Sequence, residues 1–278
     1  MSLETGNVAR ACSEVLSCCV RHWPCGQFSG KRKLGKCRKL QVDGTEMWRE
    51  LLKTAEQDKP SRSIEFFRAA REAMVEEQIR RRGVCDESVL QAMRTVPRHE
   101  FVAPEWHGKA YDDVPLPIGL EQTISQPYMV ATMTAALGLR GTERVLEIGT
   151  GCGYQAAVLA CLAREVHSVE VRPELATSAS DRLKRLGFVN VQVHCGDGSA
   201  GLSEFAPYDA ILVAASAPRL PEQLADQLSD EGRMIVPVDE EEISVLIFVR
   251  KHGTKLVVER REGCRFVPLV CHHGWEDL

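Results

Sequence analysis

Hydrophobic residues recur along this chain with two different periods. Between positions 64 and 79 they return every three to four residues, as on one face of a helix that ends at Gly83. Asp86 stands as an N-cap before a second helical pattern. From position 144 onward, short apolar runs predict strands at 145–148, 166–171, 191–195, 210–214, 234–238, 243–249 and 255–259. The segments between them predict helices at 154–163, 173–186 and 220–228.

This alternation predicts an α/β fold with a mostly parallel sheet and helices on both of its faces. A short turn at 251–254 joins the last two predicted strands, which are therefore expected to form an antiparallel hairpin at the sheet edge. Ligands of such folds bind at the carboxyl ends of the strands, where the strand order reverses. We look for the functional residues there.

The composition is that of an ordinary globular protein, since 44% of the 278 residues are hydrophobic and 27% are charged. No apolar run approaches the roughly 20 residues that a membrane-spanning helix needs, so we expect no membrane partner. The eleven cysteines are an odd number in a long chain. This does not indicate a disulfide framework, and it favours a reducing, cytoplasmic setting.

Basic residues and cysteines are concentrated near the N-terminus. The first 42 residues carry eight basic and two acidic side chains, whereas the rest of the chain has a net charge of −10. Five of the eleven cysteines also lie in that segment. We expect residues 1–62 to form a basic, Cys-rich, flexible extension and linker, and residues 63–278 to form the folded domain. An alternative is that an upstream start codon adds sequence that the working protein does not need.

The extension also suggests two binding functions that its pattern does not favour. Basic residues at 31–39 could contact nucleic-acid phosphates, but few aromatic residues are interleaved with them. Cys19, His22, Cys25 and Cys37 could be combined into a zinc site, but their spacing matches no common ligand pattern. A solvated tail that binds neither metal nor nucleic acid is the simpler interpretation.

The most specific local signal is a glycine-rich turn between a predicted strand and a predicted helix. Residues 145–154 read VLEIGTGCGY. Glycines let the backbone approach a ligand, and they leave helix N–H groups free to face it. Glu170 follows about 20 residues later, at the end of the next strand, where a carboxylate can accept hydrogen bonds from two ribose hydroxyls. The GxGxG spacing favours a nucleoside without phosphates, such as S-adenosylmethionine, whereas a purely structural turn would leave Glu170 as a coincidence.

Two further segments have both a functional and a structural interpretation. Asp197 lies between two glycines after the third strand, where its carboxylate could accept from an adenine amino group or form an Asx-turn. Ser125 precedes Pro127, which is placed to be the first residue of a helix running to about Leu137. The positive end of that helix attracts a carboxylate, although Ser125 could also be only a helix cap.

Together these motifs resemble the protein-L-isoaspartate O-methyltransferase family over positions 74–269. The resemblance rests on the glycine turn and on segments at 96–102 (VPRHEFV), 122–127 (QTISQP), 196–198 (GDG), 208–210 (YDA), 232–238 (GRMIVPV) and 265–269 (RFVPL). It implies a class I S-adenosylmethionine-dependent methyltransferase domain, a Rossmann-like three-layer sandwich, at 63–278. It also implies S-adenosylmethionine as methyl donor and the isoaspartyl carboxylate of damaged proteins as acceptor. The sequence departs from many relatives at Leu120–Glu121, where they have a glycine before the glutamine.

The resemblance also implies a set of site residues. Ser125 is the active-site residue and, with Arg265, Val267 and Leu269, binds the substrate. The expected donor-binding residues are Gln122, Thr123, Ile124, Glu147, Gly149, Thr150, Gly151, Glu170, Asp197 and Gly198. We expect a monomer. The alternative function is a related carboxylate methyltransferase that acts on a dedicated peptide.

Overall fold

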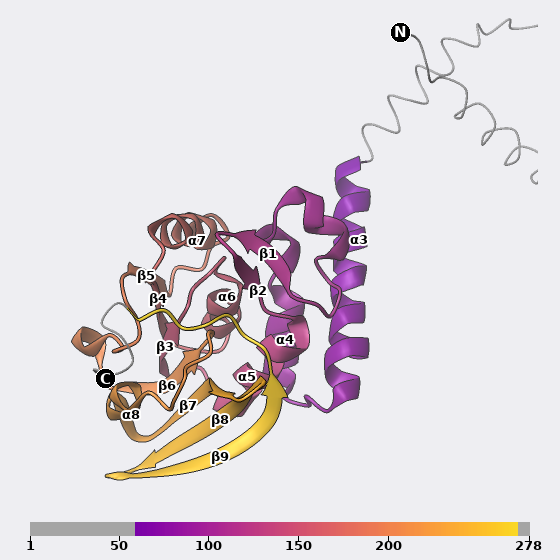
Figure 1. Ribbon diagram of the computed structural model, residues 1–278. Coiled ribbons are helices and arrows are strands. Elements are labelled where there is room, and N and C mark those ends of the chain that lie inside the picture. The colour runs from indigo at the N-terminus through magenta and orange to yellow at the C-terminus, as the bar shows by residue number, and fades with distance from the viewer. Residues whose placement is uncertain (1–58, 272–278) are drawn as a thin grey trace, which may run out of the picture. The chain divides into compact units, whose positions relative to one another are not determined.

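The computed structural model describes residues 59–271, which form a layered α/β domain (Figure 1). Almost all of the expected extension at 1–62, including the four residues considered for zinc, lies outside the described residues. The boundary between extension and domain therefore stays a prediction. The described chain contains one large sheet and one small hairpin.

The large sheet has seven strands in the order β5-β4-β3-β6-β7-β8-β9. Strands β3 to β7 run parallel to one another, and β8 and β9 are antiparallel additions at one edge, as the sequence predicted. The strands are β3 (Arg144–Ile148), β4 (Glu165–Glu170), β5 (Val191–Cys195), β6 (Tyr208–Val213), β7 (Leu228–Glu240), β8 (Ile243–His252) and β9 (Lys255–Cys264). The central strand β3 lies between β4 and β6, so the strand order reverses there and creates the expected crevice.

Alternating side chains cover both faces of the sheet. Along β6, Ala210 and Leu212 join one apolar cluster, whereas Ile211 and Val213 join another on the opposite face. Helices contribute to both clusters, which is why the buried strands read as continuous apolar runs. The helices after the hairpin are α5 (Pro127–Leu137), α6 (Tyr154–Ala160), α7 (Pro173–Arg185) and α8 (Glu222–Asp226).

The first described helix begins earlier than expected. Helix α3 (Lys59–Ala73) starts within the segment predicted as linker, and its Pro60 lies in the first turn, where a missing N–H breaks no helical bond. The helix continues as a π-helical and a 3₁₀ segment and ends at Gly83, which has φ = 99°. Helix α4 (Glu87–Thr95) follows, with the Asp86 carboxylate accepting from two N–H groups of its first turn, as predicted.

The structure contains a short hairpin that the sequence pattern did not predict, and several elements end at residues other than those predicted. Strands β1 (Leu116–Gly119) and β2 (Gln122–Ile124) pair antiparallel around Leu120 and Glu121, which have φ values of 50° and 59°. The two strands are too short for a clear period, and β1 contains a proline, which an edge strand tolerates. Helix α8 is shorter than predicted because β7 already begins at Leu228, and β9 extends to Cys264.

Candidate active site

The candidate site lies at the carboxyl ends of β3, β4 and β6. The C-terminal segment after β9 crosses these strand ends, as the yellow trace in Figure 1 shows. Backbone hydrogen bonds hold the segment there, since Ser216 N–H donates to Val267 O (2.8 Å) and Leu269 N–H donates to Ser216 O (2.7 Å). Residues from the N-terminal part of the domain, from the β1–β2 hairpin and from the C-terminal segment therefore meet over the carboxyl ends of the strands.

The glycine turn after β3 has the backbone that its sequence predicted. Gly149 and Gly151 have φ values of 92° and 55°, which disfavour any residue with a β-carbon. A β-carbon on Gly151 would also lie 3.2 Å from the Ile118 side chain of the hairpin. The turn thus passes close to β1, and a side chain at Gly151 would crowd Ile118 of the hairpin.

Glu170 ends β4 beside this turn and is only 4% exposed. Its carboxylate accepts hydrogen bonds from the backbone N–H groups of Gly151 (2.8 Å) and Arg172 (3.0 Å). These contacts fix the carboxylate at the carboxyl end of the strand, on the wall of a cavity. The cavity, here called the glycine-turn cavity, is also lined by Gln122, Thr123, Gly149, Gly151, Gly198, Ala214 and residues 267–270.

A buried acid lies beneath the turn. The Glu147 side chain is fully buried and accepts from the Ser168 hydroxyl through Oε2. Its Oε1 has no partner among the residues the structure describes. Burial, opposed by the Ser168 hydrogen bond, raises the pKa of Glu147 from 4.5 to about 8. At neutral pH this carboxyl group is therefore mainly protonated, unlike an exposed glutamate.

After β5, Asp197 forms the Asx-turn that was the structural interpretation of this motif. Its Oδ1 accepts from Ser199 N–H at 2.9 Å. The neighbouring Gly198 lines the glycine-turn cavity, and a β-carbon on it would lie 2.9 Å from Ile148. The predicted adenine contact of Asp197 stays a prediction.

Ser125 lies two residues before Pro127, the first residue of α5, as predicted. The acidic side chain at the N-terminus of this helix comes from a different segment of the chain. Asp113 Oδ1 accepts from Tyr128 N–H (3.2 Å), and Oδ2 accepts from the Gln126 amide (3.1 Å). Arg82 pairs with the same carboxylate at 2.5 Å, and its guanidinium lies 3.4 Å from the Tyr128 ring centre. The positive end of α5 is thus already occupied by a neutralised carboxylate.

A buried arginine holds the Ser125 backbone from below. Arg98 is fully buried and donates to Ser125 O and to Ala110 O, each at 2.8 Å. Its guanidinium also lies 4.8 Å from the Tyr154 ring centre. Burial lowers the pKa of Arg98, yet an arginine stays charged at neutral pH. Among residues 59–271, no carboxylate pairs with this cation, so it places positive charge close to Ser125.

Ser125 lines a second cavity of about 950 Å³, here called the serine cavity. Arg265, Val267, Arg82 and Tyr128 also line it. Thr123, Ala214 and Val267 line both this cavity and the glycine-turn cavity, so the two adjoin at these residues.

The structure brings most of the expected site residues together. Of the ten expected donor-binding residues, six line the glycine-turn cavity, and Leu269 lines that cavity rather than the serine cavity. The four that do not line it are Ile124, Glu147, Thr150 and Asp197. Arg82 was missed because the fold, rather than any local motif, brings it to Ser125, whereas Tyr128 was missed although it lies only three residues after Ser125.

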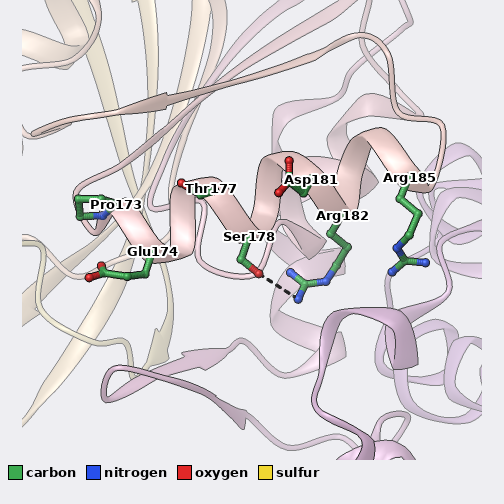
Figure 2. Close-up of a pocket in the computed structure, with 7 residues that line it drawn as sticks. All are labelled: Pro173, Glu174, Thr177, Ser178, Asp181, Arg182 and Arg185. Carbon is green, nitrogen blue, oxygen red and sulfur yellow. Dashed lines mark hydrogen bonds between the residues drawn. The ribbon is translucent and has the colours of Figure 1, made fainter.

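Another hollow lies apart from these cavities, along helix α7 (Figure 2). Its lining is mostly polar and charged side chains, and Arg182 donates to Ser178 and to Cys152 O. Between residues 59 and 271, no cluster of three potential metal-ligating side chains is present. No helix in that range is long and apolar enough to cross a membrane.

The comparisons with known sequences agree with this geometry. A family model described as protein-L-isoaspartate(D-aspartate) O-methyltransferase matches residues 69–274. The protein-L-isoaspartate O-methyltransferase of Geobacter metallireducens is 52% identical over 211 residues, covering 75% of this chain and 97% of its own. The Koribacter versatilis enzyme is 48% identical over 209 residues, covering 75% of this chain and 94% of its own.

Solved structures show the same relationship. One protein-L-isoaspartate O-methyltransferase matches with a TM-score of 0.66 and 33% identity, covering 73% of this chain and 67% of its own. A Plasmodium falciparum protein of the same description, in complex with S-adenosyl-L-homocysteine, matches with a TM-score of 0.63 and 25% identity, covering 72% and 98%. The fold is therefore the class I methyltransferase sandwich, and this chain belongs to the protein-L-isoaspartate(D-aspartate) O-methyltransferase family.

Proposed function

We propose that this chain transfers a methyl group from S-adenosylmethionine to the free carboxylate of isoaspartyl residues in damaged proteins, and that Ser125 holds that carboxylate. The observation that carries the proposal is the junction of two cavities at Thr123, Ala214 and Val267. One cavity has Glu170 and the glycine turn on its wall, and the other has Ser125.

The residues of the glycine-turn cavity fit S-adenosylmethionine. Two glycines with positive φ keep the turn free of side chains, and Glu170 offers a fixed carboxylate for hydroxyl groups. The apolar wall at Ala214 suits a nucleoside without phosphates. When bound, S-adenosylmethionine supplies an electrophilic methyl group on a sulfonium centre.

On the acceptor side, the residues need to position an anion rather than remove a proton. A carboxyl group with a pKa of about 4 is already ionised at neutral pH, so no general base is required. The Ser125 hydroxyl donates a hydrogen bond to the carboxylate, and positioning of this kind can supply several kcal/mol.

The surrounding charges favour an anion beside Ser125. Asp113 alone would repel a substrate carboxylate, but Arg82 neutralises it. Buried Arg98 then adds a positive charge that is screened little by solvent. Arg265 lies on the wall of the same cavity, where we place the substrate polypeptide.

We also place the protein in a reducing cytoplasm and propose that it acts as a monomer. The six cysteines among the described residues carry free thiols, which supports the reducing setting.

The test is a radiolabelled methyl-transfer assay on paired peptides that differ only in an isoaspartyl or a normal aspartyl residue. We expect label in the isoaspartyl peptide alone. Equal labelling of both peptides, or of neither, would contradict the proposal and favour a methyltransferase with a dedicated peptide substrate.

A further inference from the structure

A further hollow lies beside the serine cavity, between helix α5 and strand β9. It has a volume of about 330 Å³, and we call it the alanine groove. Its wall on α5 carries Thr132, Ala135 and Ala136, which follow Tyr128 at the three- to four-residue spacing of one helix face. Buried Leu246 forms part of the opposite wall.

The alanine groove is continuous with the serine cavity. Arg82, Tyr128 and Glu262 line both hollows. An extended polypeptide advances about 3.3 Å per residue and points successive side chains to opposite sides. A chain that places one residue against Ser125 therefore presents a nearby side chain to the adjoining groove.

The groove combines the small side chains of its α5 wall with three charged ones, Arg82, Arg261 and Glu262, and the α5 wall favours an apolar occupant over an acidic one. Its two guanidinium groups already have partners, since Arg82 pairs with Asp113 and Arg261 pairs with Glu259 at 2.7 Å. Arg261 also lies 5.2 Å from the ring centre of Phe248. Small-molecule pockets begin at about 300 Å³, so the groove has room for one large side chain.

We propose that the alanine groove binds an aliphatic side chain that flanks the isoaspartyl residue in the substrate polypeptide. The proposal rests on the function proposed above. It makes Ala136 and Thr132 residues that determine which damaged sites are methylated fastest. Small side chains at these positions leave the groove open, and bulk there would close it.

The experiment uses the full-length chain and isoaspartyl peptides of otherwise constant sequence. Each of the three positions on either side of the isoaspartyl residue carries glycine or leucine in turn, and kcat/KM is measured. For the wild type we expect the leucine peptide to exceed the glycine peptide at least threefold at one position, mainly through a lower KM. A ratio below three at every position overturns the proposal in favour of an occupant other than substrate.

Two variants test the groove, one that fills it and one that keeps its size. Ala136→Leu fills the groove and should reduce the leucine-to-glycine ratio to half of its wild-type value or less. Thr132→Val is nearly isosteric and removes only a buried hydroxyl oxygen that has no partner among the described residues, so it should leave the ratio within twofold of the wild-type value. A ratio that Ala136→Leu leaves above half, or that Thr132→Val changes more than twofold, contradicts the proposal.

The α7 hollow provides the matched control (Figure 2). Thr177→Leu adds similar bulk to a helix surface away from both cavities, and it should leave the ratio and the overall activity unchanged. Each ratio compares two peptides on one variant, so partial loss of folded enzyme cancels. If the wild type methylates no isoaspartyl peptide, the proposed function itself fails, and this outcome is distinct from methylation without leucine preference.

Discussion

The two cavities of the site are built in different ways. The glycine-turn cavity is formed by the carboxyl ends of strands and the turns that follow them, and the β1–β2 hairpin and the C-terminal segment complete its lining. The serine cavity is wider, and its walls come from positions as far apart as Arg82, Ser125 and Arg265. Local motifs therefore identify much of the lining of the proposed donor cavity, whereas the lining of the proposed acceptor cavity depends more on the assembled fold.

The difference also extends to electrostatics. Beneath the glycine-turn cavity, burial keeps Glu147 protonated at neutral pH. Beneath the serine cavity, burial surrounds a cation, Arg98, that no described carboxylate neutralises. A buried charge of this kind costs several kcal/mol, so its retention beside Ser125 is better explained by function than by stability.

The largest expected effect separates the two cavities at Ser125. Ser125→Ala removes the hydroxyl that we propose holds the acceptor carboxylate, and we expect kcat to fall by about 10²-fold, as for the loss of one oriented donor. The Kd of S-adenosylhomocysteine should stay within about twofold, because the change lies on the acceptor side. Ser178→Ala on α7 is the control, and steady-state kinetics with calorimetry provide both readouts. Unchanged methylation would remove Ser125 from the mechanism.

A change in the other cavity should produce the opposite pattern. Glu170→Ala removes a carboxylate that we expect to bind the ribose, and hydrogen bonds to charged groups are worth about 1.5–3 kcal/mol. The Kd of S-adenosylhomocysteine should therefore rise by about 10- to 100-fold in a calorimetric titration. Exposed Glu174, in the first turn of α7, provides the control Glu174→Ala. Donor binding that survives intact in Glu170→Ala would exclude Glu170 from the donor site.

Arg98→Met tests whether the buried cation positions the serine. The variant loses two hydrogen bonds but also a buried charge, so we expect a stability change within about 2 kcal/mol. We expect kcat/KM for the isoaspartyl peptide to fall by about tenfold, with donor affinity retained, and Arg98→Lys to restore part of the activity.

The control for Arg98 is a partly buried arginine that also bonds a backbone carbonyl. Arg233 donates to Gly138 O at 3.0 Å and lines neither cavity. Arg233→Met should therefore affect stability without a selective loss of peptide kcat/KM. The same kinetic loss in both variants would mean that Arg98 is only structural.

The last expected effect concerns stability and pH rather than activity. The pKa of Glu147 is about 8 when folded and near 4.5 when unfolded, so the folded state binds more protons between these values. Stability is therefore greatest below pH 4.5 for this group and falls as pH rises toward 8, by at most about 1.4 kcal/mol per pH unit. Urea unfolding across this range should show that Glu147→Gln removes this slope, whereas Glu174→Gln keeps it. An identical slope in Glu147→Gln would show that Glu147 is ionised throughout.

The sequence alone determined the central sheet, the glycine turn and the position of Glu170. These features depend on short-range physics: apolar runs that must be buried on both faces, and glycines where the backbone has positive φ. It also placed Ser125 before α5, because Pro127 specifies the start of that helix.

Only the tertiary structure decided what surrounds Ser125. Three residues from segments that no local period connects surround it. They are Asp113 at the N-terminus of α5, Arg82 paired with the Asp113 carboxylate, and Arg98 bonded to the Ser125 backbone. The β1–β2 hairpin likewise forms from strands too short to show a pattern. Hydrogen bonds and ion pairs between distant residues depend on where the folded backbone brings those residues. The surroundings of Ser125 are therefore decided by the tertiary structure.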